Sequence, residues 1–192
     1  MKSIILASAS PRRKGLLEKA GIPFVVEVSN YEEDMTLKLK PLDLAKKLSE
    51  GKAKAVAQRH KGEDILVVGA DTFIVFKNKV LGKPHTLNEA KKMLKEMSGN
   101  KHSVITGFTI INARSDKKVS RAVKSSVYFR KLTDKEIENY VNTGKPLDKA
   151  GSYAIQEAGS ILIEKTEGDY TNIVGLPLPA FIKELKKFKV NL

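Results

Sequence analysis

The chain has 192 residues, 41% of them hydrophobic, so it can bury a sizeable core and is not disordered throughout. It has no cysteine, which excludes a disulfide framework, a thiolate nucleophile and a metal site with Cys ligands. The apolar stretches are too short to cross a bilayer or to form a signal peptide. We therefore expect a cytoplasmic protein with no membrane partner.

The net charge of +13 raises the hypothesis of a nucleic acid partner. The lysines, however, are scattered along the chain beside 22 acidic residues, as on ordinary solvated helix faces. There is no tryptophan, and no zinc-finger, RRM or helix-turn-helix spacing. We do not expect a nucleic acid partner, and the excess charge instead favours the attraction of an anionic small substrate.

The first elements in chain order are a buried strand, a tight turn and a helix. Ser10 is predicted to be the N-cap of a helix over 11–20, with Pro11 at its first position and Gly21 beyond its end. A second helix is predicted at about 42–59, just after a proline.

The middle of the chain carries a long apolar run, "DILVVGADTFIVF" at 64–76, which predicts a buried strand with a bend. Asn78 lies between two lysines and indicates a hairpin turn. A helix is predicted at about 87–98, where Thr86 and Glu89 have the spacing of a capping box.

Two further strands are predicted in "HSVITGFTIINA" and "VSRAVKSSVYFRKL", joined by a polar turn. A helix at about 134–142 begins with a second capping box, Thr133 and Glu136. "GSILIEKTEGDYTNIVG" predicts two strands, and "PAFIKELKKF" a final helix. This intermixing favours an α/β fold, with a mixed central sheet flanked by helices. We expect a single domain over 1–192, with two lobes and a cleft.

Two arginines occupy the first turn of the first predicted helix, where the helix end already carries partial positive charge. Ser10, Arg12 and Arg13 there would bring a hydroxyl, backbone N–H groups and two guanidinium groups to the end of a strand. That set suits a phosphate chain. The alternative is a solvated helix start with incidental arginines.

Asp71 stands inside an apolar strand, where a carboxylate is costly unless it is paired, hydrogen-bonded or bound to a metal. Gly69, two residues earlier, suggests a bulge or a close backbone approach. Asp71 is therefore a candidate general base or metal ligand. The alternative is an aspartate in a turn that interrupts the run.

Other charged residues extend the candidate site. Lys52 lies in line with the apolar stripe of its predicted helix, and Lys83 stands in a tight turn between Gly and Pro. Snorkelling of Lys52 and ordinary exposure of Lys83 are the simpler explanations. The acidic run Glu32, Glu33, Asp34 can join Asp71 around Mg²⁺ or Mn²⁺, or be a solvated loop.

Neither the Walker P-loop pattern nor the GxGxxG fingerprint is present, and the three histidines show no metal-binding spacing. Together, two arginines, two lysines, a hydroxyl and several carboxylates describe a polyphosphate site with a metal. They point to a protein that binds nucleotides or cleaves a phosphoanhydride, without choosing the bond or the base.

Five blocks of sequence occur in a recognisable order over nearly the whole chain: "LASASPRRKGLLEKAGI", "GADTFIVF", "LGKPHTLNEAKKMLKEMSGNKHSVITG", "LDKAGSYAIQ" and "GDYTNIVGLPL". They resemble the Maf family of nucleoside triphosphate pyrophosphatases. The resemblance implies an α/β fold with a deep cleft, shared in architecture with the inosine triphosphatase group. It implies hydrolysis between the α- and β-phosphates, giving a nucleoside monophosphate and pyrophosphate, with a divalent cation.

The resemblance also implies roles for single residues. Asp71, in the G-A-D-T block, would be the proton acceptor that activates water. The phosphates would be held by Ser10, Arg12, Arg13, Lys52 and Lys83. We assign Asp71 and Glu33 to the divalent metal, Mg²⁺ or Mn²⁺.

Three positions separate the branches of this family. Arg13, Thr72 and Gln156 together resemble the branch that acts on dTTP and UTP, and we expect modified pyrimidine nucleotides as further substrates. The branch that favours 7-methyl-GTP tends to carry Glu at the latter two positions. A neutral Gln amide both donates to and accepts from a pyrimidine edge. Glu157 stands where the family usually has Gly, a departure in the turn after Gln156.

Two alternatives to this function stay open. One is a pyrophosphatase of the same family that prefers 7-methyl-GTP or purine nucleotides. The other is a regulator of cell division that binds nucleotide or nucleic acid and hydrolyses little. The resemblance is also compatible with a homodimer.

Overall fold

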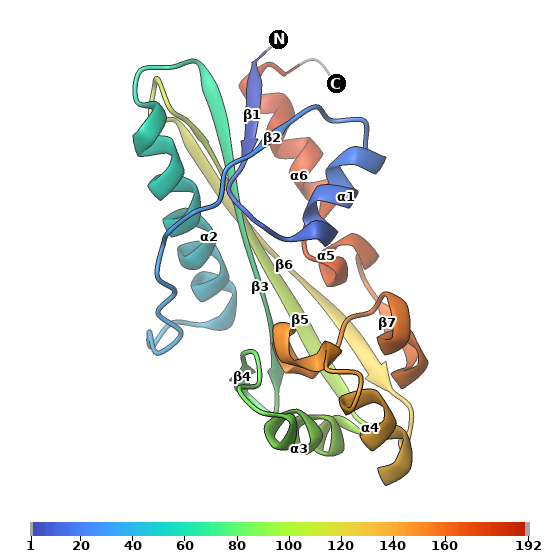
Figure 1. The fold of residues 1–192 in the computed structure, drawn as a ribbon. Coiled ribbons are helices and arrows are strands. Elements are labelled where there is room, and N and C mark those ends of the chain that lie inside the picture. Colours follow the sequence, from blue (N-terminus) through green and yellow to red (C-terminus); the bar gives the residue numbers. More distant parts are fainter. Residues whose placement is uncertain (1, 191–192) are drawn as a thin grey trace. The chain divides into compact units, whose positions relative to one another are not determined.

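A seven-stranded sheet runs through the described part of the chain, residues 2–190 of a computed structural model, with the side chain of Glu157 outside the description. Its strands are β1 (Ser3–Leu6), β2 (Val25–Val26), β3 (Ile65–Phe76), β4 (Lys79–Leu81), β5 (Lys101–Asn112), β6 (Lys118–Phe129) and β7 (Ile163–Glu167). Their order is β2-β1-β3-β5-β6-β7, and β4 pairs with β3 off this path. The sheet is mixed, because β1 is parallel to β2 and β3 while the β3–β4 and β6–β7 pairs are antiparallel (Figure 1).

Helices flank the strands, so the predicted mixed α/β class is confirmed. The α-helices are α1 (Pro11–Lys19), α2 (Pro41–Ala57), α3 (Leu87–Met97), α4 (Asp134–Val141), α5 (Tyr170–Val174) and α6 (Leu178–Leu185). The 3₁₀ turns are η1 (Gln58–His60), η2 (Lys145–Asp148), η3 (Ala150–Ser152), η4 (Glu157–Leu162) and η5 (Lys186–Phe188). None of the helices described here is both long and apolar enough to pass through a membrane.

The chain divides into two compact units. The first consists of Met1–Asp71, Thr106–Val123 and Gly175–Leu192, and the second of Thr72–Ile105 and Lys124–Val174. The three long strands β3, β5 and β6 each contribute residues to both units. The single domain over 1–192 and the deep cleft between two lobes stay predictions.

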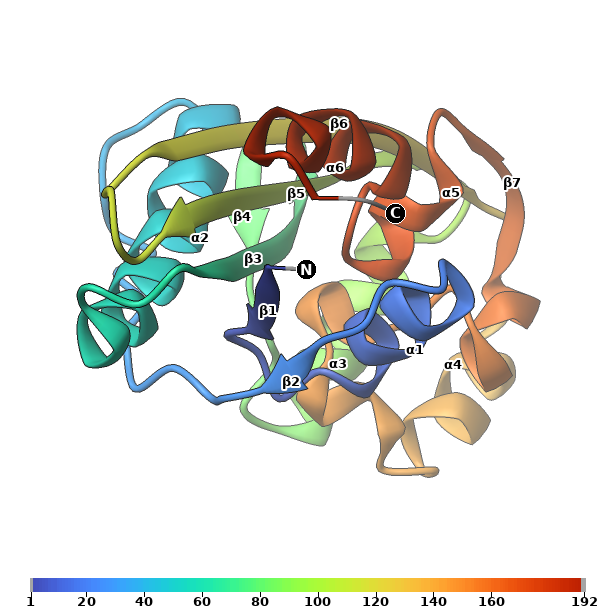
Figure 2. The ribbon, with the colours of Figure 1, turned by 90° about the horizontal axis from the view of Figure 1, so that it is seen from above.

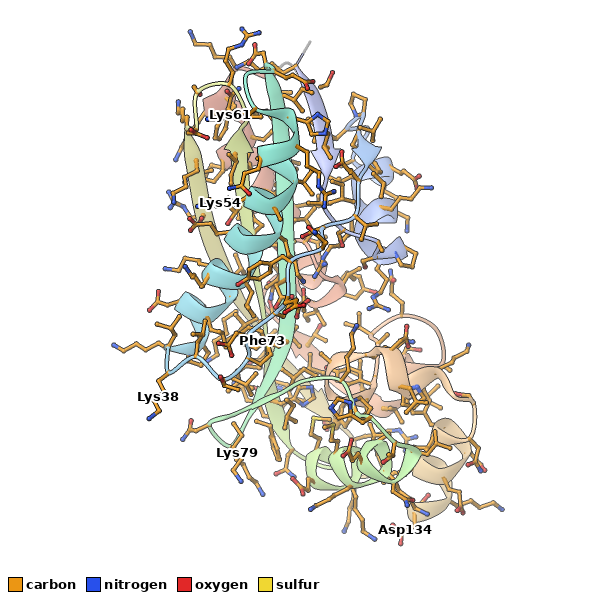
Figure 3. All side chains as sticks on the ribbon, turned by 60° about the vertical axis from the view of Figure 1, so that its left-hand side comes forward. Lys38, Lys54, Lys61, Phe73, Lys79 and Asp134 are labelled. Atoms are coloured by element: carbon orange, nitrogen blue, oxygen red, sulfur yellow. The ribbon has the colours of Figure 1, made fainter. Side chains whose placement is uncertain are left out.

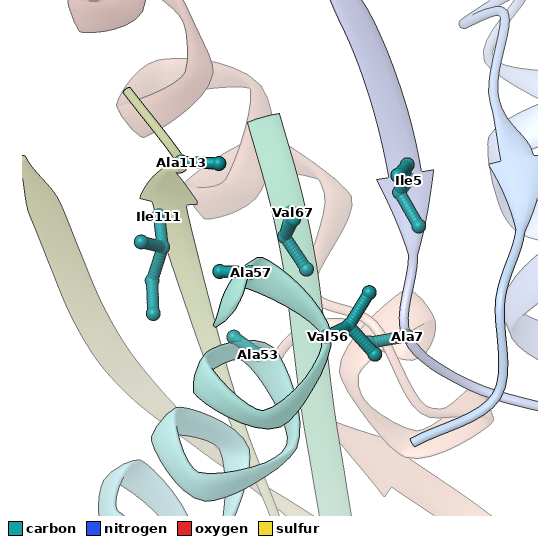
Figure 4. Close-up of a cluster of buried hydrophobic side chains, with 8 residues drawn as sticks. All are labelled: Ile5, Ala7, Ala53, Val56, Ala57, Val67, Ile111 and Ala113. Carbon is teal, nitrogen blue, oxygen red and sulfur yellow. The ribbon is translucent and has the colours of Figure 1, made fainter. Parts of the chain in front are cut away.

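In the first unit, α2 and α6 cover opposite faces of the sheet (Figures 1 and 2). Neighbouring residues on a strand point to opposite faces. Gly107 of β5 faces Ala45 of α2, whereas Phe108 packs edge-to-face on Phe181 of α6, with ring centroids 5.7 Å apart. The core under α2 is a cluster of small and β-branched side chains (Figure 4): Ile5, Ala7, Ala53, Val56, Ala57, Val67, Ile111 and Ala113.

Charged side chains lie largely on the surface and apolar side chains in the core, as the composition requires. Figure 3 shows Lys38, Lys79 and Asp134 pointing away from the ribbon, whereas Phe73 of β3 is only 1% exposed. The many lysines are thus carried largely on solvated surfaces, as the scattered pattern indicated.

Predicted helix starts and a predicted turn are confirmed where the interacting residues are close in sequence. Ser10 caps α1 by accepting a hydrogen bond from the Arg13 N–H at 3.5 Å, and Pro11 is its first residue. The hairpin between β3 and β4 turns at Lys77 and Asn78, whose φ angles of 47° and 62° lie in the left-handed region. The capping box of α4 is complete.

The capping box predicted for α3 is wrong in one half. Thr86 accepts a hydrogen bond from the Glu89 N–H at 3.1 Å, as expected. The Glu89 carboxylate, however, accepts the N–H of His85 at 2.6 Å instead of that of Thr86. The Thr86 side chain therefore caps α3, whereas the Glu89 carboxylate binds the backbone one residue before the N-cap, so the two bonds are not reciprocal.

The second strand predicted in "GSILIEKTEGDYTNIVG" is wrong: β7 ends at Glu167 and the chain enters α5. Gly168 takes a φ of 96°, which ends the extended backbone. The Asp169 carboxylate then accepts the N–H of Thr171 at 2.8 Å, as an N-cap does. The two-residue strand β2 has no counterpart among the predicted elements, because so short a segment has no periodicity.

Gly107→Ala is expected to destabilise the protein. Its added Cβ would fall inside contact distance of the Ala45 carbonyl, so α2 must move away from the sheet. Overpacking of this kind lowers the free energy of unfolding by roughly 1–3 kcal/mol. Gly15→Ala is the matched control, because nothing lies within 4 Å of a Cβ there. It should raise the free energy of unfolding by up to about 1 kcal/mol. Urea unfolding midpoints test both, and equal midpoints would contradict the close approach of α2.

Candidate active site

The two arginines of the first helical turn have different surroundings. Arg13 is 9% exposed, and its Nη1 donates to Ser8 Oγ and its Nε to the Gly175 carbonyl, both at 2.9 Å. Burial lowers the pKa of the Arg13 guanidinium, and the negative charges of Asp71 and Glu33 act against this shift. Arg13 thus anchors the turn after β1 to the segment before α6.

Arg12 is half-buried and makes no hydrogen bond or ion pair with any residue that the structure describes. Arg12 is the second residue of α1, and the N-terminal end of a helix favours an anion through its dipole. Ser10 adds its hydroxyl at the same helix end. This turn can therefore bind an anion through the Arg12 guanidinium group and the N-terminus of α1.

A second cluster lies in the same unit. Lys52 of α2 places Nζ 2.6 Å from Asp71 Oδ1 and 2.7 Å from Glu33 Oε1. The Asp71 side chain is 7% exposed and that of Lys52 13%, whereas the Glu33 side chain is 43% exposed. One ammonium group thus holds two carboxylates, one from a buried strand and one from an outer loop.

Gly69 explains how α2 comes near enough for this pairing. Asp71 and Gly69 lie two residues apart on β3 and point to the same face, toward α2. A Cβ at Gly69 would fall inside contact distance of the Ser49 carbonyl and 2.6 Å from the Ala53 nitrogen. The absent side chain lets the helix backbone approach the strand, so Lys52 reaches Asp71. The glycine before the aspartate is a close approach, as its sequence position suggested.

Glu33 reaches Lys52 because its loop is fastened along α2. The Tyr31 ring packs on Gly51, where a Cβ would overlap the ring. Near the end of α2, Arg59 Nη1 donates to Glu27 Oε1 at 2.9 Å, and His60 Nε2 lies 2.7 Å from Glu27 Oε2. The loop therefore runs against the helix over three successive contacts.

Of the acidic run, the structure brings only Glu33 to Lys52 among the residues described. Asp34 accepts hydrogen bonds from the N–H and hydroxyl of Thr36 at 2.9 and 2.6 Å, which lower the pKa of its carboxyl group. Glu32 is exposed. The described part of the chain holds no group of three or more His, Asp or Glu residues placed to bind a metal ion together.

Thr72, Lys83 and Gln156 belong to the second unit. Thr72 follows Asp71 on β3 and is half-buried, as is Gln156, which immediately precedes η4. Lys83 is exposed, and no described residue bonds its ammonium group. The loops of Lys83 and Gln156 are linked, because the Gly151 N–H donates to the Gly82 carbonyl at 2.9 Å. The Glu157 side chain lies outside the described residues.

The structure thus brings Lys52, Asp71 and Glu33 into contact, with Ser10, Arg12 and Arg13 in the same unit. A surface groove of about 340 Å³ lies elsewhere in that unit, at the end of α2 and the β5–β6 turn, and none of these residues lines it. Its lysines are exposed, and Lys118 is already paired with Glu50.

Sequence reasoning missed several residues that hold the candidate residues in place. Ser8 and the Gly175 carbonyl hold Arg13, and Tyr31 guides the loop of Glu33. Ser8 shares the S-A-S triplet with Ser10, which is a local signal for a second hydroxyl. Nothing in the sequence pairs Tyr31 with the glycine of a later helix.

A family profile described as "Maf-like protein" matches residues 3–188. The chain belongs to this family. The predicted resemblance is therefore confirmed for nearly all of the chain.

Relatives of this Maf-like chain are similar over its full length. A "dTTP/UTP pyrophosphatase" of Bacillus cereus (strain G9842) is 46% identical over 192 residues, which are 100% of this chain and 98% of the relative. One of Bacillus anthracis has the same identity and coverage. A solved "Nucleoside-triphosphatase / dITP/XTP pyrophosphatase" from Mycobacterium abscessus is 12% identical and covers 96% of this chain and 93% of that one. Its TM-score of 0.46 is too low to support a shared fold.

The protonation of His60 is expected to depend on Glu27. Their hydrogen bond raises the pKa of His60 above 6.5 and lowers that of Glu27 below 4.5. The pair's stabilisation is complete below the ordinary His pKa and is lost as pH rises through the raised one. On the acid side it is present above the ordinary Glu pKa and is lost as pH falls through the lowered one.

Glu27→Gln should therefore move the titration midpoint of His60 down toward 6.5, as measured by NMR on the three histidines. His102 is the internal control, because burial lowers its pKa to about 4 independently of Glu27. An unmoved His60 midpoint would contradict the pairing.

Proposed function

We propose that this chain is a nucleoside triphosphate pyrophosphatase that hydrolyses dTTP and UTP, and modified pyrimidine nucleotides, to the monophosphate and pyrophosphate. The observation that carries this is the meeting of Asp71 and Glu33 at the Lys52 ammonium group. The same unit holds Arg12 in the first turn of a helix, with no partner among the described residues. The names of relatives that are 46% identical over the full length support the same substrates.

The phosphates are bound by Ser10, Arg12, Arg13, Lys52 and Lys83. Arg12 contributes a guanidinium group that has no hydrogen-bond or ion-pair partner among the described residues. The dipole of α1 at its N-terminus also favours the phosphate. Arg13 places positive charge at the same turn while its Nε and Nη1 hold the backbone. An anion there answers why a helix begins with two cations.

Asp71 is the general base that takes the proton of the attacking water. Its Oδ1 accepts a hydrogen bond from the Lys52 ammonium group, and no described residue donates a hydrogen bond to Oδ2. The water oxygen bonds to phosphorus as the bond between the α- and β-phosphates breaks, pyrophosphate departs, and the water's proton goes to the carboxylate. The cationic residues stabilise the charge that develops on the phosphate oxygens.

Asp71 and Glu33 would hold a divalent cation, Mg²⁺ or Mn²⁺. Their oxygens converge on one cationic group, Lys52 Nζ, within 2.7 Å, so the donors suit a hard cation. Two carboxylates are a usual protein contribution to a Mg²⁺ site that substrate phosphates complete. When bound, the metal supplies neutralisation of phosphate charge.

Thr72 and Gln156 recognise the pyrimidine, with Arg13 as the third position of that branch. The Gln156 amide is neutral and has both a donor and an acceptor for the base edge.

We further propose that the protein is cytoplasmic, where its substrates are, and that it forms a homodimer. Its mass in solution tests the latter.

The test is pyrophosphate release from dTTP, UTP, CTP, GTP, 7-methyl-GTP and ITP, with Mg²⁺ or Mn²⁺. Fastest release from dTTP and UTP is the expected result. Release mainly from 7-methyl-GTP or ITP would keep the reaction and overturn the pyrimidine assignment. No release from any nucleotide, with binding of nucleotide or nucleic acid retained, would favour a regulatory binding protein.

Asp71→Asn should lower kcat for dTTP by about 10²- to 10⁴-fold, because an amide cannot take the proton. Binding of dTTP, measured by calorimetry without an added divalent cation, should be largely retained, since the cationic residues proposed to hold the phosphates are unchanged. Asp64→Asn is the matched control: this aspartate precedes the same strand and bonds Asn112, outside the cluster. Turnover of Asp71→Asn at the rate of this control would remove Asp71 from the mechanism.

A further inference from the structure

The segment that leads to Gln156 has a strained backbone. Gly151 and the next residue, Ser152, both have left-handed φ angles, 64° and 69°. A residue with a side chain adopts such a conformation only at a cost in free energy, so it persists only where the surroundings impose it. Ser152 is moreover fully buried. The structure therefore holds this segment in a shape that the free chain would not choose.

Residues from three parts of the second unit hold Gly151 and the strained Ser152 in this shape. The Gly151 N–H donates to the Gly82 carbonyl at 2.9 Å, and a Cβ on Gly151 would overlap the Ile74 side chain of β3. The Ser152 hydroxyl lies 3.2 Å from the Met93 sulfur on α3. These contacts involve only Gly151 and Ser152, so the residues that follow depend on a further anchor.

Tyr153 supplies the strongest anchor of the segment. Its hydroxyl lies 2.6 Å from Nε2 of His102 on β5, and His102 is only 2% exposed. Both rings pack edge-to-face with Phe129, at centroid distances of 4.7 and 4.9 Å. Burial lowers the pKa of His102 to about 4 and raises that of Tyr153, so both groups are neutral near pH 7.

The imidazole depends on this one hydrogen bond. His102 Nδ1 is buried without a hydrogen-bond partner among the described residues, so the Tyr153 hydroxyl is its partner on the other side. If that hydroxyl moved, neither ring nitrogen of the buried imidazole would have a partner among the described residues, and an unsatisfied buried polar group lowers stability. The bond therefore resists any displacement of Tyr153.

We propose that His102 and Tyr153 are positioning residues that set nucleobase selection. Their hydrogen bond fixes the segment 151–153, which presents Gln156 three residues later. Through the bond between Gly151 and Gly82, the same anchor sets the loop that carries Lys83. This inference rests on the proposed function, because it takes Gln156 as the contact to the base.

A purely structural aromatic cluster would behave differently. It would lose stability when a hydroxyl is deleted, but it would not alter the ratio of kcat/KM between two nucleotides. A positioning role changes that ratio while leaving Asp71 and Lys52 undisturbed in the first unit. The two possibilities are therefore separated by a ratio and not by activity alone.

Tyr153→Phe keeps the ring and deletes the hydroxyl. We expect the KM for dTTP to rise about 5- to 10-fold, the kcat to stay within about 2-fold, and the preference for dTTP over dCTP to fall about 5-fold, as for lost ground-state positioning. Tyr128→Phe is the matched control in the same unit, because its hydroxyl bonds Glu167 instead. Equal preference in both variants would overturn the proposal.

Amide hydrogen exchange of peptides covering 149–156 supplies a readout that needs no turnover. Exchange there should become at least about 5-fold faster in Tyr153→Phe and unchanged in Tyr128→Phe. Unchanged exchange in Tyr153→Phe would overturn the anchor. A wild-type protein that releases no pyrophosphate would overturn the proposed function and the role in base selection, while exchange would still decide the anchor.

A second pair of variants guards against misfolding. His102→Gln places an amide N–H near the position of Nε2 and should restore most of the wild-type preference. His102→Leu fills the space without a polar atom and should behave like Tyr153→Phe. Equal nucleotide preference in His102→Gln and His102→Leu would overturn the role of the hydrogen bond.

Discussion

The candidate site depends on one ammonium group that is shared by two carboxylates. Lys52 lies on a helix, Asp71 on a buried strand and Glu33 on a loop, so this ion cluster ties three kinds of backbone together. Removing Lys52 would leave Asp71 buried without its partner, and an uncompensated buried charge is far more costly than the pair. The same charges that hold the cluster together suit a metal and a phosphate chain. Folding and the proposed chemistry therefore use the same side chains.

Helix α2 is the frame on which this cluster is built. Its backbone lies against the sheet because Gly69 and Gly107 have no side chain to keep it away. On another side, Gly51 accepts the Tyr31 ring and so lets the loop of Glu33 lie along the helix. A glycine inside a helix costs about 1 kcal/mol relative to alanine, so Gly51 is explained by this contact and not by helix formation. The glycines at these positions therefore let the sheet and the loop of Glu33 come close to the helix.

The sequence predicted best what neighbouring residues determine. Ser10 and Thr133 cap their helices through partners three residues away, and both caps could be read directly. A choice among adjacent residues could not be read, because the path of the loop decides which of the acidic residues reaches Lys52. The hydrogen bond between His102 and Tyr153 spans 51 residues and leaves no local pattern. The α5 helix was missed because its β-branched residues favour a strand, and a single aspartate side chain overrides them.

The two units present different chemistry to a ligand. The first gathers charges, Lys52 with its carboxylates and Arg12 with no partner among the described residues, and in the proposed function their attraction does not depend on the base of the triphosphate. The second holds Gln156 through a strained backbone and the neutral hydrogen bond of His102 and Tyr153. Two bases differ in which of their edge atoms donate hydrogen bonds and which accept them. A side chain can use this difference only when it is held in one orientation and cannot rotate to suit another base. Strain and burial around Ser152 are therefore what the proposed selectivity requires, whereas the turn proposed to bind the phosphates can work with charges that remain partly exposed.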